Sequence, residues 1–100
     1  MIDLLPAGLR PYRRTPVFDA GSLPAGLRRE HRTRAGVWAL IHVLEGRVLF
    51  RTLDPLAEMV LQPGTPGIVR PEQPHEVQPL GAMRMFVEFY AGDSPTSGNP

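Results

Sequence analysis

The sequence contains no cysteine and no lysine, and all eleven of its basic residues are arginine. Without cysteine there can be no disulfide, no thiolate metal ligand and no cysteine nucleophile. No apolar run approaches the roughly 18 residues that a membrane span requires, and the first residues lack the basic and apolar regions of a signal peptide. Phosphate-binding loops, nucleotide-binding glycine motifs and Ser-His-Asp arrangements are missing as well. We therefore expect a cytoplasmic protein that does not associate with membranes.

The 100 residues are enough for one domain with a modest core. We expect this domain to span residues 1–93, and we expect residues 94–100, which are small, polar and proline-containing, to form a disordered tail. Residues 1–34 hold seven arginines and three acidic residues, whereas residues 35–100 hold four arginines and seven acidic residues. This arginine-rich segment either contacts an acidic partner or phosphate or, as we prefer, forms a solvated rim. If the protein binds a small anion, the basic rim would attract it. Nucleic acid is not an expected partner, because the aromatic residues fall in apolar segments and not on a basic face.

Twelve prolines and ten glycines interrupt the chain at short intervals. No segment keeps an apolar period of 3.6 residues for as long as about 12 residues, so little helix is expected. Short alternating segments between turns are instead typical of an all-β sandwich or barrel. Glu45-Gly46 is expected to form a tight hairpin turn. The expected strands are residues 16–18, 36–44, 47–53, 57–62, 67–69, 75–78 and 84–90.

The hexapeptide Leu-Pro-Ala-Gly-Leu-Arg occurs twice, at residues 5–10 and again at residues 23–28. Two copies are too few for a repeat architecture, which needs about three. The copies are interpreted either as two similar turns that lead into extended segments or as a chance recurrence.

Two of the three histidines lie at the entrance to a predicted strand. His75 follows Pro71 and Pro74, whose fixed backbone angles hold its approach rigid. His31 precedes an early strand, where loops meet at the mouth of a barrel. Zinc and ferrous iron accept imidazole together with carboxylate, and two histidines with one carboxylate leave positions open for water or substrate. His42 lies in the middle of a strand on an apolar face and is expected to be structural.

Glu88 is the candidate carboxylate. Alternation along residues 84–90 places it on one face of the strand, between Phe86 and Tyr90. A carboxylate among aromatic side chains needs a partner, because burying an unpaired charge is costly. That partner is either an arginine, such as Arg84 on the same face, or a metal ion shared with histidines.

Several short motifs together resemble those of the cupins. Val43-Leu44-Glu45-Gly46 resembles a cupin hairpin motif, and residues 63–75 resemble the second cupin motif, which ends at a metal-binding histidine. Between about residues 23 and 90 the chain is most similar to one small cupin-type family, the TehB/YeaR-like domain. The segments that carry this resemblance are residues 23–27, His31, residues 34–38, 44–46, 71–77 and 86–90.

The resemblance implies a cupin-like double-stranded β-helix, or jelly-roll β-sandwich, around a divalent metal ion, with zinc as the first choice and iron, nickel or manganese as alternatives. The first cupin motif is degraded, since Thr33, Ala35 and Ala39 stand where its ligands usually lie. The candidate metal ligands are then His31, His75 and Glu88, with Arg34 and Tyr90 lining the pocket, and with Glu72 and Glu76 ranked behind them.

Three functions remain open. The first is a small metal- or small-ligand-binding protein in tellurite, oxyanion or other stress, because the family also occurs fused ahead of an S-adenosylmethionine-dependent methyltransferase in tellurite-resistance proteins. The second is a metalloenzyme of the dioxygenase or isomerase type, in which a metal with open positions activates water or dioxygen. The third is a dimeric interaction module without metal, since cupin-type domains commonly form homodimers. The methyltransferase activity itself is not expected, because the chain lacks the length and the glycine-rich motif of that domain.

Overall fold

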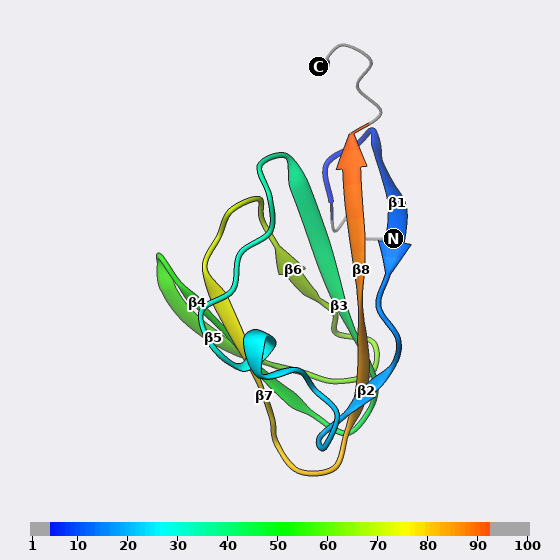
Figure 1. The fold of residues 1–100 in the computed structure, drawn as a ribbon, viewed down its shortest axis with the longest axis vertical. Helices are drawn as coiled ribbons and strands as arrows, with labels where there is room; N and C mark the ends of the chain where they lie inside the picture. Colours follow the sequence, from blue (N-terminus) through cyan, green and yellow to red (C-terminus); the bar gives the residue numbers. More distant parts are fainter. Residues whose placement is uncertain (1–4, 93–100) are drawn as a thin grey trace.

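The computed structural model describes residues 5–92, which fold into two antiparallel β-sheets packed face to face (Figure 1). The strands are β1 (Leu9–Arg14), β2 (Phe18–Asp19), β3 (Val37–Glu45), β4 (Val48–Leu53), β5 (Leu56–Leu61), β6 (Gly67–Val69), β7 (His75–Pro79) and β8 (Arg84–Gly92). The larger sheet has the order β1-β8-β3-β6, with β2 also paired to β8, and the smaller has the order β5-β4-β7. This is the all-β sandwich with little helix that the sequence predicts.

Helix within residues 5–92 is confined to one 3₁₀ turn, η1 (Ala25–Arg28). No helix in this part of the chain is long and apolar enough to cross a membrane.

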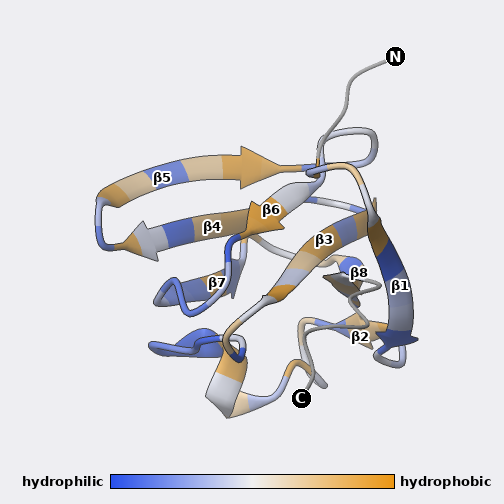
Figure 2. Cartoon of the chain, turned by 90° about the horizontal axis from the view of Figure 1, so that it is seen from above, coloured by the Kyte–Doolittle hydropathy of each residue, from blue (hydrophilic) through white to orange (hydrophobic). Residues whose placement is uncertain are grey.

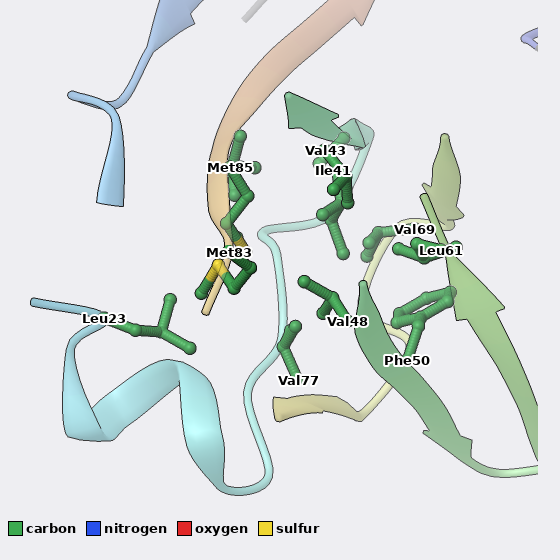
Figure 3. Close-up of a cluster of buried hydrophobic side chains, with 12 residues drawn as sticks. Leu23, Ile41, Val43, Val48, Phe50, Leu61, Val69, Val77, Met83 and Met85 are labelled. Carbon is green, nitrogen blue, oxygen red and sulfur yellow. The ribbon is translucent and has the colours of Figure 1, made fainter. Parts of the chain in front are cut away.

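The core lies between the two sheets (Figure 3). Alternate residues of β3, namely Ala39, Ile41 and Val43, point toward the smaller sheet, as the period of two in a strand requires. Val48 and Phe50 of β4 meet them from the other side. The rest of this buried cluster comes from the other strands and connections: Leu23, Leu61, Val69, Val77, Met83, Met85 and Val87. This buried cluster therefore holds the two sheets against each other.

The strands predicted from residue 36 onward are confirmed, with ends displaced by at most two residues. The edge strand predicted at residues 16–18 is observed as β2, which shares only Phe18 with the prediction. The tail predicted at residues 94–100 lies outside the described residues.

Strand β1 is absent from the sequence prediction. It contains Pro11 and three arginines, and all its residues after Leu9 are exposed, so it has no apolar alternation to reveal it. In Figure 2, β1 is mostly hydrophilic, whereas β3 is mostly apolar. It pairs with β8 at the edge of the larger sheet, and its register shifts between Pro11 and Arg13. Edge positions tolerate a residue without a backbone N–H, which explains how proline fits there.

The two copies of the hexapeptide adopt different structures. The first leads into β1, whereas the second contains η1. Leu23 at the start of the second copy is buried in the core, and Leu5 at the start of the first is not. Tertiary packing, and not the hexapeptide itself, thus decides the local conformation.

Candidate functional site

His31 and His75 lie side by side, as the sequence predicts for two loops that meet at a strand entrance. Their backbones exchange two hydrogen bonds, His31 N–H to His75 O at 2.8 Å and His75 N–H to His31 O at 2.9 Å. Residues that are paired in this way point their side chains to the same side of the sheet. The two imidazole rings accordingly meet edge to face, with centroids 5.4 Å apart and planes at 82°.

The imidazole of His75 is buried, and only one of its two ring nitrogens has a hydrogen-bond partner within residues 5–92. The residue is 3% exposed, and its ring packs edge-on against Phe50 with 5.8 Å between the ring centroids. Nδ1 lies 3.0 Å from the backbone oxygen of Gln73, which can only accept, so Nδ1 carries the proton. Nε2 is then an acceptor, and no residue from 5 to 92 donates a hydrogen bond to it. A buried polar atom without a partner calls for an explanation, such as a bound ligand or water.

The turn before His75 fixes this geometry. Gln73 N–H donates to Arg70 O at 3.2 Å, and Glu72 has a left-handed backbone, with φ of 58°. Thr33 holds the turn from the opposite loop: its hydroxyl donates to Arg70 O at 3.3 Å and accepts from Glu72 N–H at 3.1 Å. The prediction of a rigid approach to His75 agrees with this arrangement, and Thr33 is a supporting residue that sequence reasoning treated only as a missing ligand.

Two hollows lie next to each other at His31. The inner one, of about 40 Å³, lies inside the sandwich and is mostly apolar. The outer one, of about 260 Å³, opens to the surface. They share His31, Thr33 and Phe89. The inner cavity is also lined by His75, Val77 and Val87 among others, and the outer hollow by Tyr12, Arg13, Arg32, Arg34 and Val37.

Glu88 does not belong to this site, which corrects the predicted grouping of three ligands. Its neighbours along β8, Val87 and Phe89, line the inner cavity, so alternation turns Glu88 to the opposite face of the sheet. There its Oε1 lies 3.1 Å from His42 Nε2 and accepts from Tyr90 OH at 2.9 Å, while Oε2 lies 3.4 Å from Arg14 Nη2. The sequence analysis gives an arginine as one possible partner of Glu88, with Arg84 as the example. The structure shows an arginine partner, but it is Arg14.

The hydrogen-bond partners of Glu88 explain how its carboxylate stays ionised among aromatic side chains. Burial by itself raises the pKa of Glu88, but the bonds from Tyr90, His42 and Arg14 outweigh it and hold the pKa below its usual value. Phe86 supports the group, since the His42 ring stacks on it at 4.7 Å between centroids and the Arg14 guanidinium lies 4.7 Å from its centre. His42 is structural, as predicted.

Of the other predicted site residues, some lie at the two hollows and the others lie elsewhere. Arg34 lines the outer hollow, in agreement with the prediction, whereas Tyr90 bonds to Glu88 on the far face and does not line it. Glu76 pairs with Arg51 at 2.8 Å, and Glu72 is exposed. Arg13 was missed, because it lies on the strand that the sequence does not reveal.

The residues present do not fit a cupin-type metal centre. A protein zinc or iron site usually takes three or four ligands from side chains, and residues 5–92 contain no group of three histidine or carboxylate side chains placed to share an ion. One feature of such sites is present, because His75 donates its second ring nitrogen to a backbone carbonyl, as metal-bound histidines do. At this site the described residues offer two imidazoles, fewer ligands than such a metal centre takes.

A second, larger groove of about 830 Å³ lies open at the surface and is mainly apolar. Trp38, Phe50, Met59 and Ile68 line it, and Arg70 is the one side chain among its lining residues that is charged. Among the described residues that line it, only Phe50 is buried, and the side chain of phenylalanine has no polar atom. The histidine pair is therefore the better candidate for the functional site.

The stability of the protein is expected to fall as the pH drops below about 6.5, the ordinary value for histidine. Burial lowers the pKa of His75, so the unfolded chain takes up a proton at a higher pH than the folded chain does. By linkage, the stability that this histidine contributes is fully present above its unfolded pKa and is lost as the pH falls toward its folded pKa. Urea unfolding of wild type and His75→Gln between about pH 7 and pH 5 measures the effect.

The His75→Gln variant should show a flatter pH dependence than the wild type in this range, and His31→Gln, which retains the buried ring, should keep most of it. A wild-type His75 ring that titrates above about 6.5 in an NMR pH series contradicts the expectation, whether or not the variants fold.

Known proteins resemble this chain in both fold and sequence. An Escherichia coli K12 protein of known crystal structure is similar over 92% of this chain and 98% of its own, with a TM-score of 0.80 and 21% identity. The crystal structure of TehB from Haemophilus influenzae matches 86% of this chain and 32% of its own, with a TM-score of 0.79 and 26% identity. Hydroxypropylphosphonic acid epoxidase from S. wedmorenis matches in fold, with a TM-score of 0.55 and 20% identity over 81% of this chain and 42% of its own. The fold is thus the cupin-like sandwich that the resemblance implies.

The sequence comparisons agree. A curated relative from Haemophilus influenzae, named "Probable S-adenosyl-L-methionine-dependent methyltransferase TehB", is 31% identical over 74 residues, which cover 69% of this chain and 26% of the relative. The chain thus spans about a quarter of the length of that relative. The family model described as the TehB-like domain matches residues 13–87. The chain belongs to the TehB-like domain family.

Proposed function

We propose that this TehB-like domain binds a small ligand at the mouth of the sandwich, around the His31–His75 pair. The observation that carries the proposal is the Nε2 atom of His75, a buried acceptor with no partner in residues 5–92, in a residue that lines a small cavity next to a wider hollow. Small-molecule sites in proteins commonly combine apolar walls with a few well-placed polar groups. Val77, Val87 and Phe89 form such walls here.

The site is suited to holding a ligand without reacting with it. Burial lowers the pKa of His75, so its ring is neutral near pH 7 and offers a lone pair. The bond to Gln73 O fixes which nitrogen offers it. Among the described residues that line the inner cavity, the titratable groups are His75 and His31, and no third group is placed to relay a proton.

The test is an NMR screen of the full chain against a set of small neutral and charged compounds. We expect binders to shift the amide signals of residues that line the inner cavity, including Thr33, Val77 and Phe89. The His75→Gln variant should weaken binding by roughly tenfold or more, because it removes the imidazole acceptor. His42→Gln, a histidine change on the opposite face, should leave binding unchanged. Binders that shift only residues outside both hollows contradict the proposal, even where His75→Gln fails to fold.

The adjacent imidazoles support a second candidate, a divalent metal held by His31 and His75 with the ligand completing its coordination. Elemental analysis of protein purified without a His tag tests it, beside His31→Ala, His75→Ala and Glu88→Ala. One zinc, iron, nickel or manganese ion per chain, lost in both histidine variants and kept in Glu88→Ala, supports a two-imidazole site. Wild-type protein without metal after incubation with each ion excludes it.

A role in tellurite, oxyanion or other stress, a cytoplasmic location and a homodimeric state remain predictions from the sequence. So does the alternative of a metalloenzyme. The relatives' methyltransferase name describes a protein about four times as long as the matching segment, and it does not define the role of this domain.

A further inference from the structure

We infer that the ligand of this site is a small anion that also carries an O–H group, with its charge at the arginine rim and its hydroxyl donated to His75. This inference rests on the proposed binding function and adds the chemical class of the ligand. Inorganic phosphate in its monohydrogen form and small hydroxycarboxylates share this chemistry.

The outer hollow supplies positive charge. Three arginines, Arg13, Arg32 and Arg34, line it together with His31, and none of its lining residues is acidic. The side chains of Arg13 and Arg34 make no hydrogen bond or ion pair within residues 5–92. Arg32 is already engaged, with Glu30 Oε2 at 2.9 Å and Glu72 O at 3.5 Å. The guanidinium groups of Arg13 and Arg34 are therefore available to donate hydrogen bonds to an anion. Arginine commonly binds carboxylate and phosphate groups through two parallel hydrogen bonds.

The inner cavity supplies the second requirement. Since Nδ1 of His75 donates to Gln73 O, Nε2 presents a lone pair, and a lone pair is satisfied only by a donor. A fully deprotonated anion such as sulfate offers no donor and would place its oxygen against this lone pair. An anion with one O–H group satisfies both ends of the site.

The dimensions agree with a small ligand. The inner cavity of about 40 Å³ accommodates one hydroxyl group or a water molecule. The outer hollow of about 260 Å³ accommodates the charged part. The two hollows share the lining residues His31, Thr33 and Phe89, so they lie next to each other, and the inferred ligand would reach from one into the other.

The experiment compares matched pairs of anions in NMR titrations of the full chain near neutral pH. Phosphate and sulfate are similar in size and charge, but only phosphate carries a proton; glycolate and acetate differ in the same way. We expect phosphate to bind at least about tenfold more tightly than sulfate, and glycolate more tightly than acetate, because the site has a buried acceptor to satisfy. Comparison of the two pairs identifies which source of anion the site prefers.

Variants of the rim test the charge. Arg34→Gln and Arg13→Gln should each weaken phosphate binding about tenfold, since each removes a charged donor. Arg29→Gln removes the same charge from the same third of the chain, but Arg29 lines neither hollow, so binding should change little. Equal effects of all three substitutions would show general electrostatic attraction and overturn the inference.

The outcomes separate this inference from the proposed function. If neutral compounds shift the cavity signals and none of the four anions does, the site binds ligands but the chemical class is wrong. If sulfate binds as well as phosphate, the hydroxyl requirement is wrong. If no compound of any kind shifts the cavity signals, the cavity holds only water and both proposals fail.

Discussion

Replacing Gly46 with alanine is expected to lower the free energy of unfolding by about 2–5 kcal/mol. Gly46 forms the turn between β3 and β4 with φ of 76°, a conformation that costs side-chain-bearing residues free energy. A methyl group there would also meet the backbone oxygen of Ala82 and lie 3.0 Å from Met83 Cα. Both obstacles are backbone atoms, so they cannot turn aside as a flexible side chain would.

Gly64→Ala is the matched control, because Gly64 has φ of 89° and open space around the position of a methyl group. It should cost only the conformational part, about 1–2 kcal/mol. Chemical denaturation of the two variants measures the difference, which is the cost of the clash. Equal losses would show that the connection after β7 does not pack against the β3–β4 turn as described.

Glu88→Ala is expected to destabilise the protein by about 1–3 kcal/mol. The substitution leaves His42, Tyr90 and Arg14 without the carboxylate that joins them. The loss is expected to be large for an ionic group because the Glu88 side chain is only 15% exposed. Since the pKa of Glu88 is held below its ordinary value of 4.5, the stabilisation is present above that pH and is lost as the pH falls further. The stability difference between wild type and variant should therefore shrink in acid.

Glu45→Ala serves as the control for Glu88→Ala. Glu45 pairs with Arg84, but both side chains are more than half exposed, and such pairs contribute little, so a change within about 0.5 kcal/mol is expected. A loss of ligand binding in Glu88→Ala at full stability would contradict the placement of Glu88 on the far face.

The sequence allowed most of the sandwich to be predicted, because turns and alternation mark the strands from residue 36 onward, whereas β1 has no apolar alternation. Prolines around residues 71–74 predicted the rigid entrance to His75, and the structure brings His31 to the same place. The turns and strands are predicted because each depends on residues close together in the chain, whereas the meeting of His31 and His75 depends on the fold.

The partner of Glu88 could not be predicted, because it depends on which face of β8 points inward. Alternation correctly groups Glu88 with Phe86 and Tyr90, and the opposite face, with Met85 and Val87, is the apolar one that is buried. Because both faces carry large apolar side chains, the aromatic residues beside Glu88 could be taken for part of the core. Only the pairing of β8 with β3, which places His42 opposite Phe86, settles the question.

The most direct test of the proposed site is the charge state of the His75 ring, which long-range ¹H–¹⁵N NMR of the full chain near neutral pH measures. We expect a neutral ring with the proton on Nδ1, and an Nε2 signal that moves when phosphate is added and does not move with sulfate. A ring protonated on Nε2, or an Nε2 signal that responds to no small molecule, would contradict the claim that this atom is a ligand-facing acceptor.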